Sequence, residues 1–365
     1  RRHTRFRNVT GVQTCALPIC LDAPLAGTDV EKLRDMLAVF GGLSRQGVGA
    51  GRTYSYRNQF GRAGYERLPG LPGEPGRPLS PLALDELLRS NIWNDFIFRD
   101  AAYAWQTSLL EPVGGMDAIV AAFLRQPLSR RAGTLGMLVQ YGAQATAIET
   151  AADRVMVGYQ DTGGARSLTA DYAVSTLPMP IFAGLKTNLP PAVVTAAREL
   201  PGVAAGKIGW QAERFWETKD NIFGGISWTS DDISQIFYPS HGFLSAKGIL
   251  VGAYVSGRGA LEFNALPVPE RLDLARHQGE KLHPGYGAQV EQGIAVAWER
   301  MPFARQAWAD HTAPGFDERA QRLIAPQGRL HLAGDQLTHW SGWQEGAILS
   351  AWNAAAAISG VQARP

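Results

Sequence analysis

The C-terminal segment HLAGDQLTHWSGWQEGAILSAWNAAAAI holds the residues best suited to bind a charged or electron-rich group. Leu330 and Leu332 predict a buried strand, a Gly-Asp turn follows, and a helix begins near Gly342 and Trp343. A helix N-terminus offers unpaired backbone N–H groups and a positive dipole end, which suit a phosphate or a ring edge. Gly346 in the first turn would let a ligand approach the backbone closely. On these grounds alone, a purely structural strand–turn–helix is the simpler interpretation.

The remaining sequence alternates strand and helix patterns. Residues 206–259 predict a series of strands, and the alternation over residues 154–159 before a polar Asp-Thr-Gly-Gly link predicts a hairpin. Residues 190–200 predict a helix with Pro near its start, and residues 342–358 predict an Ala-rich helix. These blocks predict an α/β fold of mixed α+β character. Because 365 residues exceed the usual size of one domain, we expect two domains built from non-contiguous segments.

Composition and charge argue against several classes of function. A net charge of +2 without a basic stripe indicates no nucleic-acid partner, and no apolar run approaches the roughly 20 residues of a membrane helix. His277 and His283 are not spaced to share a helix face, and no H-E-x-x-H motif occurs, so we expect no metal site. The absence of a G-x-S-x-G motif argues against a serine hydrolase.

The start of the chain differs from the rest. Residues 1–20 are basic and aperiodic, so we expect a non-native leader, with a disordered leader as the alternative. No apolar stretch of signal-peptide length follows, which argues against a signal peptide at this terminus. Cys15 and Cys20 both lie in this run. The body of the chain therefore has no disulfide, thiolate metal site or thiol nucleophile. The sequence does not distinguish a cytoplasmic from an exported protein.

The C-terminal segment closely resembles the FAD segment of the flavin monoamine oxidase family. In that family a strand ending AG-[ED] precedes a helix start W-x-G-[YW]-x-E-G-A. The resemblance assigns FAD binding to Gln344 and to the residues that match this pattern: Ala333, Gly334, Asp335, Trp340, Gly342, Trp343, Glu345, Gly346 and Ala347. Asp335 stands where the family more often has Glu, which keeps the carboxylate on a shorter arm.

Two earlier segments fall in family order. LLEPVGGMDAI resembles the Gly-Gly turn of L-amino-acid oxidases that packs near the flavin, which assigns cofactor contacts to Gly114, Gly115 and Met116. GAQATAIETA, followed by ADYAVSTLP, resembles the strand that binds adenine through its backbone and the strand that ends in a TLP turn near the cofactor. The resemblance gives the adenine contact to Ala145, where the family often has Val.

Further resemblances assign catalytic and substrate-binding roles. In KIGWQAERFWE, Lys207 matches the lysine that holds a water against the flavin, and its alternative is a surface strand lysine. In GGISWTSDDISQIFYPSHG, Tyr238 matches a tyrosine that binds the substrate carboxylate, and its alternative is a half-buried strand tyrosine. Trp343 and Trp308 match the aromatic pair that holds the amine. Ala307 stands where monoamine oxidases have the Cys that bonds the flavin, so FAD is expected to be non-covalent.

The resemblance implies a flavin amine oxidase that takes an L-amino acid or a primary amine, with O2 as the second substrate. The family's first βαβ unit, with its G-x-G-x-x-G motif, is not found, so we expect an FAD-binding Rossmann-like domain without that unit and a substrate domain with a mixed sheet. A chain that is catalytically silent, a polyamine oxidase-like protein and a flavin monooxygenase relative are the alternatives, and a homodimer is left open. The expected domain boundaries are 1–20 for the leader, 21–105 and 183–310 for the substrate domain, and 106–182 and 311–365 for the FAD-binding domain.

Overall fold

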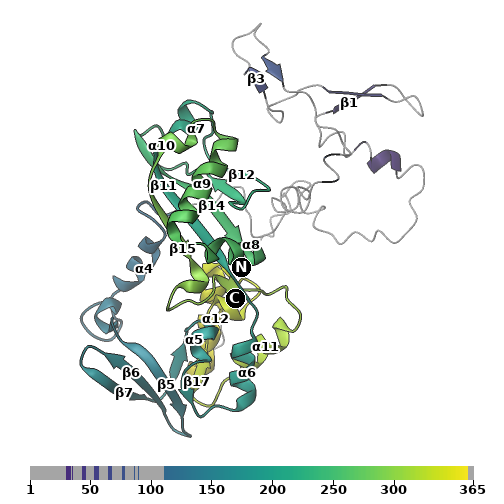
Figure 1. The fold of residues 1–365 in the computed structure, drawn as a ribbon. Coiled ribbons are helices and arrows are strands. Elements are labelled where there is room, and N and C mark those ends of the chain that lie inside the picture. The colour runs from purple at the N-terminus through teal and green to yellow at the C-terminus, as the bar shows by residue number, and fades with distance from the viewer. Residues whose placement is uncertain are drawn as a thin grey trace. The chain divides into compact units, whose positions relative to one another are not determined.

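In the largest sheet of the computed structural model, buried and exposed side chains alternate along the strands. In β11, Ile208, Trp210 and Ala212 are buried while the residues between them face the other way. The sheet has the order β12-β13-β14-β11-β15, and neighbouring strands are antiparallel wherever they pair (Figure 1). Its strands are β11 (Ala205–Glu213), β12 (Ile226–Trp228), β13 (Gln235–Phe237), β14 (Lys247–Ser256) and β15 (Val290–Ala297).

Glycines on the neighbouring strands make room for the Trp210 ring. A Cβ on Gly252 would lie 2.3 Å from that ring, and a Cβ on Gly293 would lie 2.2 Å from it. The core beneath the ring is completed by α9, whose Leu272 and Ala275 pack against the same cluster. The helices that accompany this sheet are α7 (Phe215–Thr218), α8 (Gly257–Ala265), α9 (Val268–Leu282), α10 (Tyr286–Gln289) and η4 (Trp298–Arg300).

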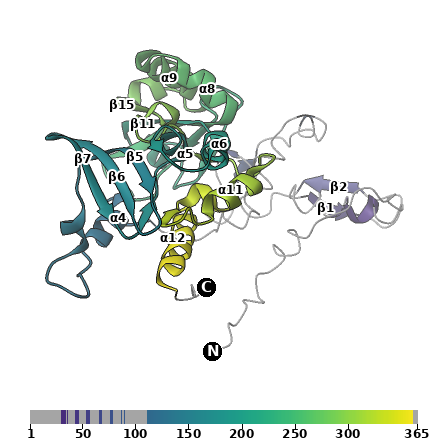
Figure 2. The ribbon, with the colours of Figure 1, turned by 90° about the horizontal axis from the view of Figure 1, so that it is seen from below.

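A second hydrophobic core is formed by residues that precede and follow the five-stranded sheet along the chain. Buried Ile148, Val155 and Ala197 pack in one cluster with Leu323 and Leu330. Around it lie a four-stranded sheet of order β7-β6-β5-β9, the parallel pair β8 and β17, and the neighbouring helices α5, α6 and α11 (Figure 2). Its elements are β5 (Gln144–Thr150), β6 (Val155–Asp161), β7 (Gly164–Ala170), β8 (Ala173–Ser175), α5 (Met179–Phe182), β9 (Lys186–Thr187), α6 (Pro191–Glu199), β10 (Gly202–Val203), β16 (Trp308–Ala309), α11 (Phe316–Ile324), β17 (Leu330–Leu332), η5 (Asp335–Leu337) and α12 (Gln344–Ser359).

The structure describes residues 111–360 and short pieces before them: 30–33, 35, 43–46, 53–56, 65–67, 76–78, 86 and 89. The chain divides into a unit Arg1–Val139 and a unit Gln140–Pro365, and both cores belong to the second. The labelled elements of the first unit are the antiparallel pairs β1 (Leu43–Gln46) with β2 (Thr53–Tyr56) and β3 (Tyr65–Arg67) with β4 (Arg77–Pro78), then α4 (Asp117–Leu124) and η3 (Leu135–Leu138).

Several expectations from the sequence are confirmed. The fold is mixed α/β, β6 and β7 form the predicted hairpin, and α6 and α12 fall on the two predicted helices. The strands expected over residues 206–259 are β11 to β14. The domain boundaries stay predictions, and α6 packs in the second core although they assign it to the substrate domain. Residues 1–20 lie outside the described part. No helix in the described part is long and apolar enough to cross a bilayer.

Candidate functional site

The carboxyl ends of the parallel strands β8 and β17 begin the candidate site. Leu332 pairs with Ser175, and the backbone N–H of Ala333 donates to the Ser175 carbonyl at 3.0 Å. Gly334 follows with φ +136°, a conformation that favours glycine. The Ser175 hydroxyl is buried and has no hydrogen-bond partner within the described residues. Ligands of α/β sheets bind beyond the carboxyl ends of parallel strands, so this unpaired hydroxyl marks a place suited to one.

Two side chains fix the loop that leaves β17. The Asp335 carboxylate accepts the backbone N–H of Gly342 at 2.6 Å, which closes the loop over residues 335–342. The Gln336 side chain accepts the N–H of Met179 at 2.9 Å and donates to the carbonyl of Leu177 at 2.8 Å. The bond to Leu177 joins the loop to the Thr-Leu-Pro turn that follows β8. The Gln336 side chain therefore links two segments that lie more than 150 residues apart along the chain.

The start of α12 is packed against this loop. Trp343 is the N-cap residue of α12, and its side chain makes no capping hydrogen bond because an indole ring has no acceptor oxygen. The N–H groups of the first turn are therefore left to other partners. Gly346 is buried, and a Cβ there would lie 2.5 Å from the Trp340 carbonyl oxygen and 2.5 Å from the Thr338 hydroxyl. The space that the sequence analysis gave to a ligand at Gly346 is thus filled by the chain's own loop. Trp343, Gln344 and Glu345 are exposed.

The two predicted aromatic residues lie beside this helix start. A Cβ on Gly342 would lie 3.6 Å from Trp308, so the loop before Trp343 packs directly on that side chain. Trp308 lies on β16, where it pairs with Val203 of β10. Because β10 leads into β11 after a single residue, the helix start is linked through Trp308 to the strand that carries Lys207. The structure therefore places Trp343, Trp308 and the Lys207 strand in one connected framework.

Lys207 lies directly opposite Tyr254 on neighbouring antiparallel strands. The Lys207 Nζ is 4.4 Å from the centre of the Tyr254 ring, a cation–π geometry. Desolvation around the ammonium group lowers the pKa of Lys207 from its usual value. Tyr254 in turn packs against Phe237, with ring centres 5.5 Å apart. Sequence reasoning missed Tyr254, because its relation to Lys207 depends on strand register, although the alternation in GILVGAYVS was a signal for it.

Tyr238 lies on the opposite side of the sheet from Lys207, in the buried core. Its hydroxyl is 2.7 Å from the Ser227 hydroxyl and 2.6 Å from Nε2 of His283, whose Nδ1 is 2.8 Å from the Asp220 carboxylate. With Nδ1 donating to the Asp220 carboxylate, Nε2 is the acceptor for the Tyr238 hydroxyl. Burial raises the pKa of Tyr238 to about 12, so the phenol is neutral. The structure does not bring Tyr238 to the face that carries Lys207.

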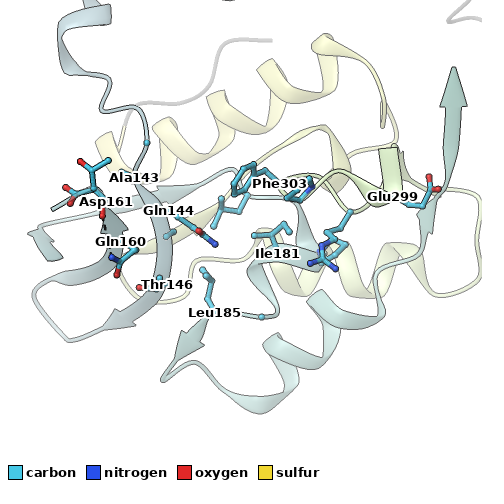
Figure 3. Close-up of a pocket in the computed structure, with 17 residues that line it drawn as sticks. Ala143, Gln144, Thr146, Gln160, Asp161, Ile181, Leu185, Glu299 and Phe303 are labelled. Atoms are coloured by element: carbon cyan, nitrogen blue, oxygen red, sulfur yellow. Dashed lines mark hydrogen bonds between the residues drawn. The ribbon is translucent and has the colours of Figure 1, made fainter. Parts of the chain in front are cut away.

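Ala145 lines a cavity of about 1270 Å³ in the second unit. Residues of β5 form one wall, Ile181 and Phe303 lie across from it, and Glu299 lies at the far end (Figure 3). β9 pairs with β5 only at residues 147 and 148. The end of β5 that lines the cavity, at Ala145, is therefore not paired with β9. The residues of the segment 333–347 lie outside this lining. The cavity is large enough for a cofactor-sized ligand.

The Gly-Gly turn lies in the first unit. Gly114 and Gly115 have φ +98° and +116°, and the N–H of Gly115 donates to the Pro112 carbonyl at 3.2 Å. Met116 follows as the N-cap residue of α4. The turn therefore has the backbone that only glycines adopt readily, as expected from its sequence. Among the described residues, no group of three or more His, Cys, Asp and Glu side chains is placed to hold a metal ion.

A model of the flavin containing amine oxidoreductases matches residues 73–359. The chain belongs to this family. The amine oxidoreductase chain is 27% identical over 259 residues to a flavin-dependent L-tryptophan oxidase of Lentzea aerocolonigenes, covering 68% of this chain and 53% of that protein. It is 30% identical over 264 residues to an L-amino-acid oxidase of Daboia russelii, covering 70% of this chain and 50% of that protein. The chain thus spans about half the length of these relatives.

The structural comparison agrees on the fold. A putrescine oxidase variant superposes with a TM-score of 0.51 at 17% identity, covering 60% of this chain and 48% of that one. At this identity the match supports the architecture of the amine oxidoreductase chain and not its substrate. The α/β fold expected from the resemblance is therefore confirmed, and so is the membership of an oxidoreductase family.

Proposed function

We propose that this amine oxidoreductase chain serves the FAD-dependent oxidative deamination of an L-amino acid or a primary amine. The observation that carries the proposal is the connected framework of the α12 start, Trp308 and β11. It joins the loop predicted to hold the flavin to β11, the strand that presents Lys207 opposite Tyr254 of β14. Relatives named L-tryptophan oxidase and L-amino-acid oxidase support this substrate class.

The residues present fit FAD. The uncapped first turn of α12 offers N–H groups to an electron-rich ring edge, and the unpaired Ser175 hydroxyl lies where parallel strands end. We propose cofactor contacts for the residues that the family pattern marks in this loop and helix, except Gly346, whose space the loop itself fills, together with the backbone of Ala145. The turn at Gly114, Gly115 and Met116 is assigned to the cofactor on the resemblance alone. Ala307 has no atom that could bond the flavin, which supports non-covalent binding.

The chemistry that bound FAD supplies is acceptance of a hydride from the carbon that bears the amine, followed by reoxidation by O2 to give hydrogen peroxide. Lys207 is proposed to hold a water at its Nζ beside the reacting centre. Because its pKa is lowered, the Lys207 side chain loses its proton at a lower pH than an exposed lysine does. Trp343 and Trp308 are proposed to orient the amine between their rings. The imine product then hydrolyses in water.

Tyr254 is the better placed of the two tyrosines to bind a substrate carboxylate. Its ring lies beside the Lys207 ammonium on the outer face of the sheet, whereas Tyr238 lies in the core on the opposite face, where Ser227 and His283 share its hydroxyl. A phenol donates a hydrogen bond to a carboxylate without bringing a charge of its own. The carboxylate role given to Tyr238 from the sequence would require one of its buried hydrogen bonds to be broken, so we propose Tyr254 for that role.

Matched substitutions of the two tyrosines test this assignment. In the flavin-loaded protein, Tyr254→Phe is expected to raise KM for an L-amino acid and to leave KM for the corresponding plain amine unchanged. Tyr238→Phe is expected to lower stability without this split between substrates. Equal effects of Tyr254→Phe on both substrates would contradict a carboxylate role, and a split seen only for Tyr238→Phe would restore the earlier assignment.

A further inference from the structure

A buried pair of glutamine side chains joins three segments beside the candidate site. The Nε2 of Gln306 donates to the Oε1 of Gln336 at 3.2 Å, and both residues are buried. The same Gln336 oxygen accepts the backbone N–H of Met179, and the Gln336 nitrogen donates to the Leu177 carbonyl. A buried amide that loses a partner is costly, so these bonds hold the three segments together.

The two backbone partners fix the orientation of the Gln336 amide. Its oxygen faces the Met179 N–H and its nitrogen faces the Leu177 carbonyl, because exchange of the two ends would bring like groups together. The Gln336 oxygen is therefore the atom that faces Gln306, and Gln306 can bind it only as a donor. A side chain without an N–H group at position 306 would lose this bond while Gln336 kept both of its backbone partners.

The backbone around Gln306 is shaped to place its side chain inside. Arg305, directly before it, has φ +61°, a left-handed conformation that is strained in a residue with a Cβ. On β10, a Cβ on Gly202 would lie 2.6 Å from the Gln306 side-chain oxygen, so the strand has room for this side chain because residue 202 is a glycine. Both features bring Gln306 against Gln336.

Trp308 is connected to Gln336 by two short routes. Along the chain, Trp308 follows Gln306 by two residues. Through space, Trp308 packs on Gly342, whose N–H donates to Asp335, the neighbour of Gln336. The consecutive residues 335 and 336 therefore hold both the loop that packs on Trp308 and the segment that carries it.

We propose that the Gln306–Gln336 pair is a positioning element that fixes the Trp308 ring relative to the loop predicted to hold the flavin. Its consequence for catalysis rests on the proposed function, in which Trp308 orients the amine. When the pair is broken, FAD is expected to remain bound while the ring loses its fixed position beside the amine. A pair with only a structural role would lower stability without a change at Trp308.

The Trp308 ring itself reports the first test, in the full chain labelled with fluorotryptophan and without flavin. Trp308→Phe identifies its fluorine NMR resonance among those of the 10 tryptophans. Gln306→Met removes the donor and keeps an unbranched side chain of similar length, and it is expected to shift or broaden the Trp308 resonance. Gln336→Met is expected to do the same, although it lies far from Trp308 along the chain.

Gln278→Met supplies the matched control. Gln278 is a buried glutamine of α9 that accepts the N–H of Ile233 and donates to the Asp232 carboxylate. Its replacement removes a comparable number of buried hydrogen bonds from the first core. It is expected to lower the urea midpoint of unfolding and to leave the Trp308 resonance unchanged.

A second measurement follows the consequence in the flavin-loaded protein. Gln306→Met is expected to retain FAD and to lower kcat about ten- to a hundredfold with a smaller change in KM, which is the effect of misplacing a bound substrate. Gln306→Glu keeps the shape of the side chain and replaces the donating NH2 group by an acceptor. It is expected to have the same effects, and it takes the place of Gln306→Met if that variant does not fold.

An unchanged Trp308 resonance in Gln336→Met, or an equal change of that resonance in Gln278→Met, would overturn the inference. A loss of kcat in Gln278→Met as large as that in Gln306→Met would also overturn it. A parent protein that retains FAD but is reduced by no L-amino acid or amine refutes the proposed function instead. The fluorine spectra then still decide whether the pair positions Trp308.

Discussion

Gly346→Ala is predicted to destabilise the protein although alanine favours helices. The new methyl group would lie 2.5 Å from the Trp340 carbonyl oxygen and 2.5 Å from the Thr338 hydroxyl. The hydroxyl can rotate away, but the backbone carbonyl is held in the loop closed by Asp335. Overpacking of this kind costs about 1–3 kcal/mol, while helix propensity returns at most about 1 kcal/mol. Because the carbonyl cannot move away, the cost is expected in the upper part of that range, about 2–3 kcal/mol, so the net loss is about 1–2 kcal/mol.

Gly259→Ala supplies the matched control. Gly259 is exposed in α8, has an ordinary φ, and a Cβ there meets nothing within 4 Å. The same substitution is expected to stabilise the protein by about 0.4–1 kcal/mol, because it restricts the unfolded chain without strain in the folded one. The two variants therefore have opposite predicted signs for an identical chemical change.

Urea unfolding followed by tryptophan fluorescence measures both variants, and calorimetry gives their melting temperatures. For a unit of this size, 1 kcal/mol corresponds to about 2–4 °C, so Gly346→Ala is expected to melt about 2–8 °C lower. The loop before α12 must also shift, so flavin retention is expected to fall with it. A Gly346→Ala protein as stable as the parent would refute the packing of this helix start against its loop.

Three further substitutions test individual contacts. Asp335→Ala is expected to cost about 1–2 kcal/mol in urea unfolding, because it removes the acceptor for the Gly342 N–H, and Asp335→Asn should cost less; equal losses would argue against a role for that oxygen. Tyr238→Phe is expected to cost about 1–3 kcal/mol, because Ser227 and His283 lose a buried partner, and a neutral result would contradict that network. Because the pKa of Lys207 is lowered in the folded state, the unfolded chain keeps this proton to a higher pH. The free energy of unfolding is therefore expected to rise with pH up to the ordinary lysine pKa of 10.5. Lys207→Met should lack this rise in urea titrations between neutral and alkaline pH.

The sequence predicted the elements better than the orientation of side chains. The α12 helix and the β6–β7 hairpin follow from local patterns, because apolar periodicity and turn residues act over a few positions. Tyr238 and Tyr254 could not be ranked in that way. Both lie on or beside strands of one sheet, and only the register and the alternation of faces decide which one meets Lys207.

The glycines show the same limit. The sequence assigned the space at Gly346 to a ligand, but the neighbour there is the Trp340 carbonyl, a contact that depends on how the preceding loop folds back. Gly252 and Gly293 carried no signal in the sequence, because nothing local distinguishes them from other strand glycines such as Gly209. Their contact with the Trp210 ring becomes visible only when the three central strands are assembled. Long-range packing therefore decides the role of each glycine.

The measurement that tests the central claim most directly is an absorbance spectrum of the purified chain after incubation with FAD and desalting, followed by anaerobic addition of an L-amino acid. The account predicts retained flavin bands that bleach on addition of the amino acid and return when O2 is admitted. Flavin bands that no L-amino acid or primary amine bleaches would contradict the proposed reaction. A colourless protein would contradict the claim that the described residues form a cofactor site.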